Sequence, residues 1–197
     1  MYRSLRWSIA LIVLAMIPVS RATAHGPGRP PQPQGDHQGD DDDQGDSQPV
    51  LKATLKGLAE VPAVISDGHG RFQATLNQAG DELTYSLSYT DLEGAAQQAH
   101  IHVGQRFAAG GIAVFLCTNL GNGPAGTQAC PNAPGAITGT IKAADVIGPA
   151  TQGVGAGDFT DLLRAIRVGD AYVNVHTDVA PGGEIRGQLR VDDNGHQ

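Results

Sequence analysis

Apolar and polar residues alternate with a period of two in several short stretches between residues 50 and 191. The clearest is 83–90, where leucines and tyrosines alternate with serines and threonines. In a β-strand this alternation puts apolar side chains on one face and polar ones on the other, which is typical of a half-buried strand. Similar stretches are 51–56, 72–76, 98–103, 112–116, 136–142, 171–177 and 184–191, separated by clusters of Gly, Pro, Asn and Asp. The pattern predicts a mainly β fold, an antiparallel β-sandwich or barrel.

One segment follows a helical period instead. Its apolar residues recur three or four positions apart, at Phe159, Leu162, Leu163 and Ile166. Asp158 is a suitable N-cap, Asp161 puts negative charge in the first turn, and Gly169 ends the element. We therefore expect one short helix, packed by its apolar stripe across one end of the β-core.

Two of the expected strands carry histidines on the side away from the core. In the segment 99–103, Ile101 and the two other apolar residues face the core. Because successive side chains of a strand point to opposite faces, His100 and His102 share the other, polar face.

The segment 172–177 repeats this arrangement. Val173 and Val175 take the core side, and the residues left on the polar face are Tyr172, Asn174 and His176. If the two strands are neighbours, three imidazoles meet on one polar surface. Such a cluster is a metal site, a hydrogen-bonded structural network or a chance arrangement.

Residues 178–183 are expected to join the last two strands as a hairpin, with Pro181 and Gly182 at the centre of a type II turn. Directly opposed residues of an antiparallel pair share a face. If the valines of 171–177 face the same way as Ile185, then His176 stands opposite Glu184 or Arg186. The register therefore puts these two charged residues on the polar face beside His176.

The two ends of the chain differ in composition from the β-region. Residues 1–24 have a basic start, a short apolar run and small residues before His25, which predicts a removed secretory signal and a secreted or periplasmic protein. The apolar run is too short to span a bilayer, so no stable membrane span is expected after the signal is removed, and a retained membrane anchor is the alternative. Residues 25–49 are rich in Pro, Gln, Gly and Asp and predict a disordered tether. The domain should cover 50–191, followed by a flexible tail at 192–197.

The charge balance bears on the partners. The chain has a formal net charge of −7, and the basic residues of the β-region are scattered along the sequence without a basic stripe. A nucleic-acid partner is therefore not expected, because a phosphate-binding face needs clustered cations. An extracellular protein, matrix component or small ligand stays open as the partner.

The only two cysteines, Cys117 and Cys130, bracket a loop rich in Gly, Asn and Pro. In an exported chain two cysteines so placed are expected to form a disulfide. On the chain-entropy model a loop of this size contributes on the order of 3 kcal/mol to stability.

The chain resembles the chordin-domain (CHRD) family over about residues 51–190. The segments that carry the resemblance are GLAEVP at 57–62, AHIHVG at 99–104, GDAYVNVHT at 169–177 and PGGEIRGQL at 181–189. The family usually has a second proline where this chain has Ala63. The resemblance implies an extracellular, nearly all-β domain that is repeated in animal chordin and single in many exported microbial proteins. It implies no general biochemical activity, and the cysteine-rich modules that carry growth-factor binding in chordin do not occur here.

The histidine cluster gives the sharpest hypothesis on function. Two imidazoles two residues apart on one strand, with a third from a neighbour, suit copper or zinc. The spacing is similar to the His-x-His copper arrangement outside the barrel of copper-zinc superoxide dismutase, although no bridging histidine with a zinc-ligand set is recognisable.

We therefore expect an exported binding or structural module, with His100, His102 and His176 as candidate metal ligands. The neighbours expected to orient them, or to orient an organic ligand, are Glu184, Arg186, Asn174 and Tyr172. A redox-type metalloenzyme is the alternative, and an amino-terminal His25 is a further candidate copper chelator. No catalytic residue is assigned, because the sequence shows no hydrolase motif.

Overall fold

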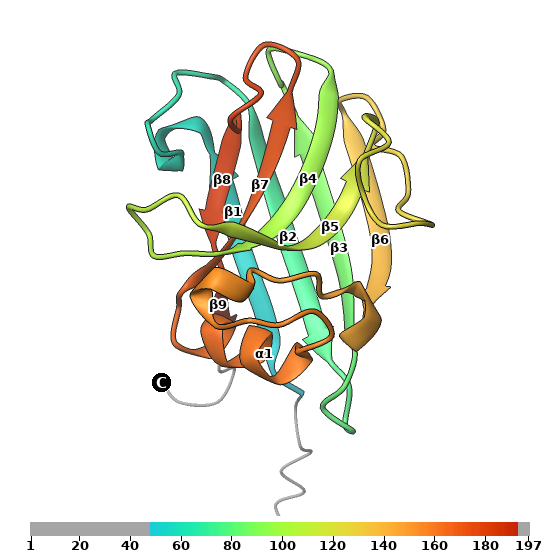
Figure 1. Ribbon diagram of the computed structural model, residues 1–197. Helices are drawn as coiled ribbons and strands as arrows, with labels where there is room; N and C mark the ends of the chain where they lie inside the picture. Colours follow the sequence, from blue (N-terminus) through green and yellow to red (C-terminus); the bar gives the residue numbers. More distant parts are fainter. Residues whose placement is uncertain (1–47, 193–197) are drawn as a thin grey trace, which may run out of the picture. The chain divides into compact units, whose positions relative to one another are not determined.

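The computed structural model describes residues 48–192 (Figure 1). The strands are β1 (Val50–Lys56), β2 (His69–Leu76), β3 (Leu83–Thr90), β4 (Ala96–Val103), β5 (Gly111–Thr118), β6 (Gly135–Ile141), β7 (Ala171–Thr177), β8 (Ile185–Gln188) and β9 (Arg190–Asp192). The helices are α1 (Phe159–Arg167) and the short 3-10 turns η1 (Gly57–Ala59), η2 (Ala143–Asp145) and η3 (Ala150–Gln152). The expected signal, nearly all of the expected tether and most of the expected tail lie outside the described residues.

The strands form one antiparallel sheet in the order β5-β4-β7-β8-β1-β2-β3-β6, with β9 also paired to β1. This sheet curls into a nearly closed barrel (Figure 1). The prediction of a mainly β, antiparallel sandwich or barrel with one short helix is confirmed. No helix in residues 48–192 is both long and apolar enough to cross a bilayer.

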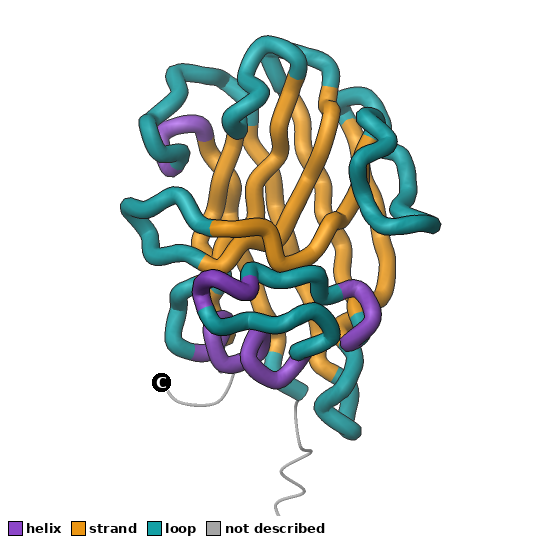
Figure 2. Tube along the Cα trace, in the orientation of Figure 1, coloured by secondary structure: helices purple, strands orange, loops and turns teal. Residues whose placement is uncertain are grey.

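The barrel interior contains the apolar faces expected from the alternation. Leu55, Leu87, Ile101 and Val173 are completely buried, and they come from four different strands. Helix α1 lies with η2 and η3 at one end of the barrel (Figure 2), and its Leu162 belongs to the same core. Asp158 is the N-cap of α1, as predicted, because its carboxylate accepts a hydrogen bond from the Asp161 N–H.

The gap between the edge strands β5 and β6 is bridged by the segment that connects them. Cys117 and Cys130 form the predicted disulfide, which ties this segment to β5. The Tyr85 hydroxyl donates to the Leu116 carbonyl, and the Gln128 amide donates to the Thr138 carbonyl of β6. These contacts hold the two edges in place where no ladder joins them.

The hairpin register is as predicted, but its turn is not. Val175 pairs with Ile185, so the two core faces match. The turn closes by a 3.0 Å hydrogen bond from Gly183 N–H to the Ala180 carbonyl. The positive φ of +124° lies at Gly183 and not at Gly182, so the expected type II turn is wrong. The expected single strand over 184–191 is likewise divided into β8 and β9.

Candidate metal centre

The three histidines meet on the outer side of neighbouring strands. Strand β4 pairs with β7 so that His100 is opposite Asn174 and His176 is opposite Gln98. The His100 Nδ1 and His176 Nε2 atoms are 3.1 Å apart. One ligand nitrogen from each of His100, His102 and His176 lies within 4.8 Å of the other two. The pleat therefore brings the three rings together, as the sequence pattern predicts.

The polar face of these strands is not open to water, contrary to the sequence interpretation. His100 is 1 % exposed and His102 7 % exposed, whereas His176 remains partly accessible. The Phe115 ring of β5 packs edge-on against His100 at 4.4 Å between ring centroids. The residues 104–110, which connect β4 to β5, supply a further covering contact through Gly110. From Ala99 to Val103 both faces of β4 are therefore buried.

Two of the rings are held in a defined tautomer by backbone carbonyls. His102 Nδ1–H donates to the Gly110 carbonyl at 2.9 Å, and His176 Nδ1–H donates to the Pro181 carbonyl at 2.9 Å. Each ring then has its lone pair on Nε2. A ring that donates its other N–H to a carbonyl is the usual arrangement of a metal-bound histidine. In the metal-free protein this network assigns the His100 Nδ1–H as donor to His176 Nε2.

Four buried polar atoms around the cluster have no hydrogen-bond partner among the described residues. They are His100 Nε2, His102 Nε2, Glu60 Oε1 and Asn174 Oδ1. A buried polar atom without a partner costs about 1–3 kcal/mol, so native structures contain few of them. Asn174 lies next to two of these groups, the Glu60 carboxyl and the His102 ring. The Nε2 atoms of His100 and His102 carry lone pairs that are open to a hydrogen-bond donor or a cation.

Glu60, which follows η1, is a residue of this region that the sequence reasoning missed. A side chain at Gly183 would collide with its Oε1, so the glycine allows the carboxyl to approach the 178–183 turn. Burial raises the pKa of Glu60 to about 7, and the positive charge of Arg186 acts in the opposite direction. The motif GLAEVP contains Glu60, but a period-two pattern cannot orient a residue beyond the end of a strand.

Arg186 and Tyr172 form the predicted polar neighbours of the cluster. The Tyr172 ring stacks on His102 with 4.8 Å between centroids, and the Arg186 guanidinium carbon lies 3.4 Å from the Tyr172 centroid. Arg186 Nη2 donates to the carbonyls of Gln105 at 2.8 Å and Ala108 at 3.0 Å. Arg186 therefore fixes the connection from β4 to β5, whose Gly110 orients His102.

The Glu184 carboxylate does not lie among the histidines. It accepts hydrogen bonds from Ser66 Oγ, Thr177 Oγ1 and the Glu93 N–H, at 2.7, 2.7 and 2.8 Å. Glu184 precedes β8, so strand alternation does not fix the direction of its side chain. The Glu184 carboxylate therefore links three connections at the barrel rim. The carboxyl group beside Asn174 is that of Glu60.

All three histidines are held neutral by their surroundings. Burial, reinforced by His176 and His102, lowers the pKa of His100 to about 3. Burial also lowers the pKa of His102 to about 4, with the Gly110 hydrogen bond acting against the shift. The pKa of His176 is lowered by burial as well. At neutral pH the three rings are therefore in the neutral form, which is the form that a metal ligand must have.

The metal-free domain is expected to lose stability in acid. The unfolded rings titrate near 6.5, and the folded pKa values of His100 and His102 are about 3 and about 4. Below pH 6.5 the unfolded state binds protons that the folded state excludes. The free energy of unfolding therefore decreases as the pH is lowered below 6.5, by about 1.4 kcal/mol per pH unit for each histidine. Glu60 opposes this loss between its unfolded pKa of 4.5 and its folded pKa of about 7.

Urea unfolding of chelator-treated protein over this pH range measures the effect. The variant His102→Gln should flatten the loss, and Glu60→Gln should steepen it above pH 4.5. An unchanged slope in His102→Gln would show that this ring is not kept neutral by folding.

Comparison with known proteins gives one family match. A family model described as the CHRD domain matches residues 51–189. Searches of curated proteins and of solved structures found no match. The matched range includes Glu60, all three clustered histidines and both cysteines.

Proposed function

The chain belongs to the CHRD-domain family, and from this premise we propose that it is an exported binding module that holds one copper or zinc ion through His100, His102 and His176. The disulfide and the domain type are compatible with an extracellular or periplasmic protein. The composition of residues 1–24 and 25–49 supports a removed signal and an acidic tether ahead of the domain.

The observation that carries the metal proposal is the pair of unpartnered Nε2 atoms on His100 and His102, close to the His176 ring. A purely structural network would be expected to satisfy these buried atoms. A cation that accepts lone pairs from the three rings would replace the hydrogen bond between His100 and His176 and would satisfy the unpartnered Nε2 of His102.

The ligand set also indicates the kind of ion. Neutral imidazoles suit copper and zinc, whereas calcium and magnesium prefer oxygen ligands. Three histidines leave a fourth position for water or a small ligand, which is how catalytic zinc sites differ from closed structural ones. His176 is the partly accessible member, so exchange with solvent would take place on its side.

The alternative of a redox metalloenzyme has no specific support among the described residues. The one other histidine in 48–192, His69, is exposed, and its Nδ1 contacts the Asp67 carbonyl at 3.2 Å. It does not join the cluster, so a second metal with a bridging histidine has no ligand set in this part of the chain.

Metal titration of the full chain, first stripped with a chelator, tests the proposal. We expect one equivalent of Zn²⁺ or Cu²⁺ to bind. At a free metal concentration of about 100 times Kd, the linkage contributes about 2.7 kcal/mol, which raises Tm by about 5–10 °C. The variant His25→Ala is the matched control and should bind the same equivalent. Absence of binding, or loss of binding in His25→Ala, would contradict the assignment.

A further inference from the structure

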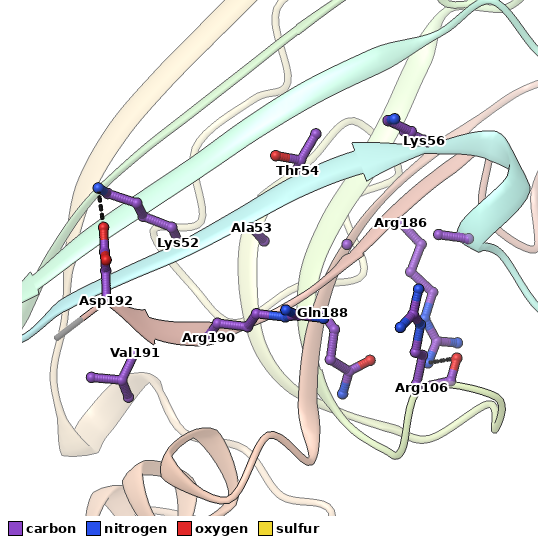
Figure 3. Close-up of a pocket in the computed structure, with 12 residues that line it drawn as sticks. Lys52, Ala53, Thr54, Lys56, Arg106, Arg186, Gln188, Arg190, Val191 and Asp192 are labelled. Carbon is purple, nitrogen blue, oxygen red and sulfur yellow. Dashed lines mark hydrogen bonds and ion pairs between the residues drawn. The ribbon is translucent and has the colours of Figure 1, made fainter. Parts of the chain in front are cut away.

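The outer face of β1, β8 and β9 forms a groove lined by cations. Its volume is about 530 Å³. The polar side chains along it come from two adjoining rows: Lys52, Thr54 and Lys56 on one side and Arg186, Gln188 and Arg190 on the other, with Arg106 at one end (Figure 3). Five of the nine basic residues that the sequence scatters through the domain therefore lie together, and Asp192 is the only acidic residue in the lining.

The register of these strands places like charges opposite each other. Lys52 is paired with Arg190, and Lys56 is paired with Arg186. Directly opposed like charges destabilise an antiparallel pair. Lys52 is compensated by an ion pair with Asp192, but Lys56 and Arg190 form no ion pair within residues 48–192. Lys56 and Arg190 are therefore two groove cations without a carboxylate partner in this part of the chain, and an anionic ligand would supply one.

We propose that this groove binds an acidic polysaccharide, a chain that carries carboxylate or sulfate groups at intervals. The groove cations are spread along the strands: Lys52 and Lys56 are four residues apart on one face, which corresponds to about 13 Å. Such spacing fits an extended polymer with repeated charges better than a single compact anion. Lys52, Lys56 and Arg190 are exposed, so their ammonium and guanidinium groups are available to the ligand.

The lining also distinguishes between classes of polyanion. It contains no aromatic residue on which a nucleic-acid base could stack. Its apolar members are Ala53, Ala59 and Val191, which offer little surface for insertion among lipid chains. The hydroxyl of Thr54 lies between the cations and suits the hydroxyl groups of a sugar, whereas the Gln188 amide already donates to the carbonyls of Gly104 and Gly169.

The groove does not depend on the histidine cluster. Two residues link the regions: Arg186, which already donates to Gln105 and Ala108, and Arg106, which belongs to the connection 104–110 beside the histidines. The residues that reach the polysaccharide are Lys52, Lys56, Arg106 and Arg190. Chelation of metal should therefore leave polysaccharide binding unchanged, which keeps this test separate from the metal assignment.

Binding of the full chain to immobilised dextran sulfate and polygalacturonate tests the proposal, with neutral dextran as the blank. We expect binding to the sulfated polymer, the carboxylated one or both, weakening as salt is raised because counterions compete for the same cations. The double variant Lys56→Gln with Arg190→Gln should lose at least about 10-fold in affinity at low salt, the fold-change that follows from about 1.4 kcal/mol. Its Tm should be unchanged or higher, because like-charge repulsion is relieved.

The matched control removes two exposed cations from α1, as Arg164→Gln with Arg167→Gln, and should keep its affinity. An equal loss in this control would overturn the groove assignment. Equal or tighter binding to an oligothymidine or to phosphatidylglycerol vesicles would overturn the choice of polysaccharide. Absence of binding to both acidic polymers would overturn the proposal as a whole.

Discussion

Replacement of Arg186 by methionine is expected to lower the free energy of unfolding by about 3–5 kcal/mol, the range seen when one partner of a buried charged network is removed. Arg186 is 2 % exposed and stacks on Tyr172. Its loss would leave the carbonyls of Gln105 and Ala108 without their donor and Glu60 without its neighbouring positive charge. Methionine keeps most of the side-chain volume, so the effect reports the polar contacts.

Urea denaturation midpoints measure this loss. Arg190→Met is the matched control, because Arg190 is exposed on the following strand, and surface changes of this kind usually stay within about 0.5 kcal/mol. Arg186→Lys should recover only part of the stability, because an ammonium lacks the planar fork of the guanidinium. If Arg186→Met and Arg190→Met unfold at the same urea concentration, Arg186 does not fix the connection from β4 to β5.

Replacement of His102 by glutamine is expected to weaken metal binding by more than about 100-fold. Loss of an outer-shell partner of a metal ligand typically costs 10–100-fold, and loss of a ligand should cost more. Glutamine retains an amide that can donate to the Gly110 carbonyl, so the connection from β4 to β5 keeps its contact. Alanine would be a poorer choice, because it also removes the stacking partner of Tyr172.

Competition with a chelator of known affinity measures this change, with His69→Gln as the matched control. His69 is exposed and outside the cluster, so its variant should bind metal as the unchanged protein does. Unaltered affinity in His102→Gln would remove His102 from the ligand set. Equal weakening in His69→Gln would place the ion at a different site.

The period-two pattern predicted most of the fold, and it predicted the meeting of the histidines on the condition that their two strands are neighbours. Ile101, Val173 and Val175 had to face the core, and the neighbouring pair β4–β7 then brought His100 and His176 to one side. The pattern could not predict that this side is buried. Its cover comes from Phe115 of β5, from the 178–183 turn that His176 contacts, and from residues 104–110, whose path depends on the long-range contact with Arg186.

The remaining misses have a common physical origin. Glu60 and Glu184 both lie just outside strands, where the backbone direction is set by tertiary contacts and not by the pleat. Glu184 therefore turned to Ser66 and Thr177, and Glu60 took the place beside the cluster. The basic groove was hidden for a related reason, because β1 and β8–β9 are more than 120 residues apart in sequence yet adjacent in the sheet.

Anomalous diffraction from crystals grown with one equivalent of Zn²⁺ or Cu²⁺ tests the metal assignment most directly. We predict one strong peak within about 2.0–2.1 Å of a ring nitrogen from each of His100, His102 and His176, the usual distance for imidazole ligands. The hydrogen bonds from His102 to Gly110 and from His176 to Pro181 should persist, because they orient the ligands. A metal-soaked crystal with no peak at the cluster, and with His100 still hydrogen-bonded to His176, would contradict the assignment.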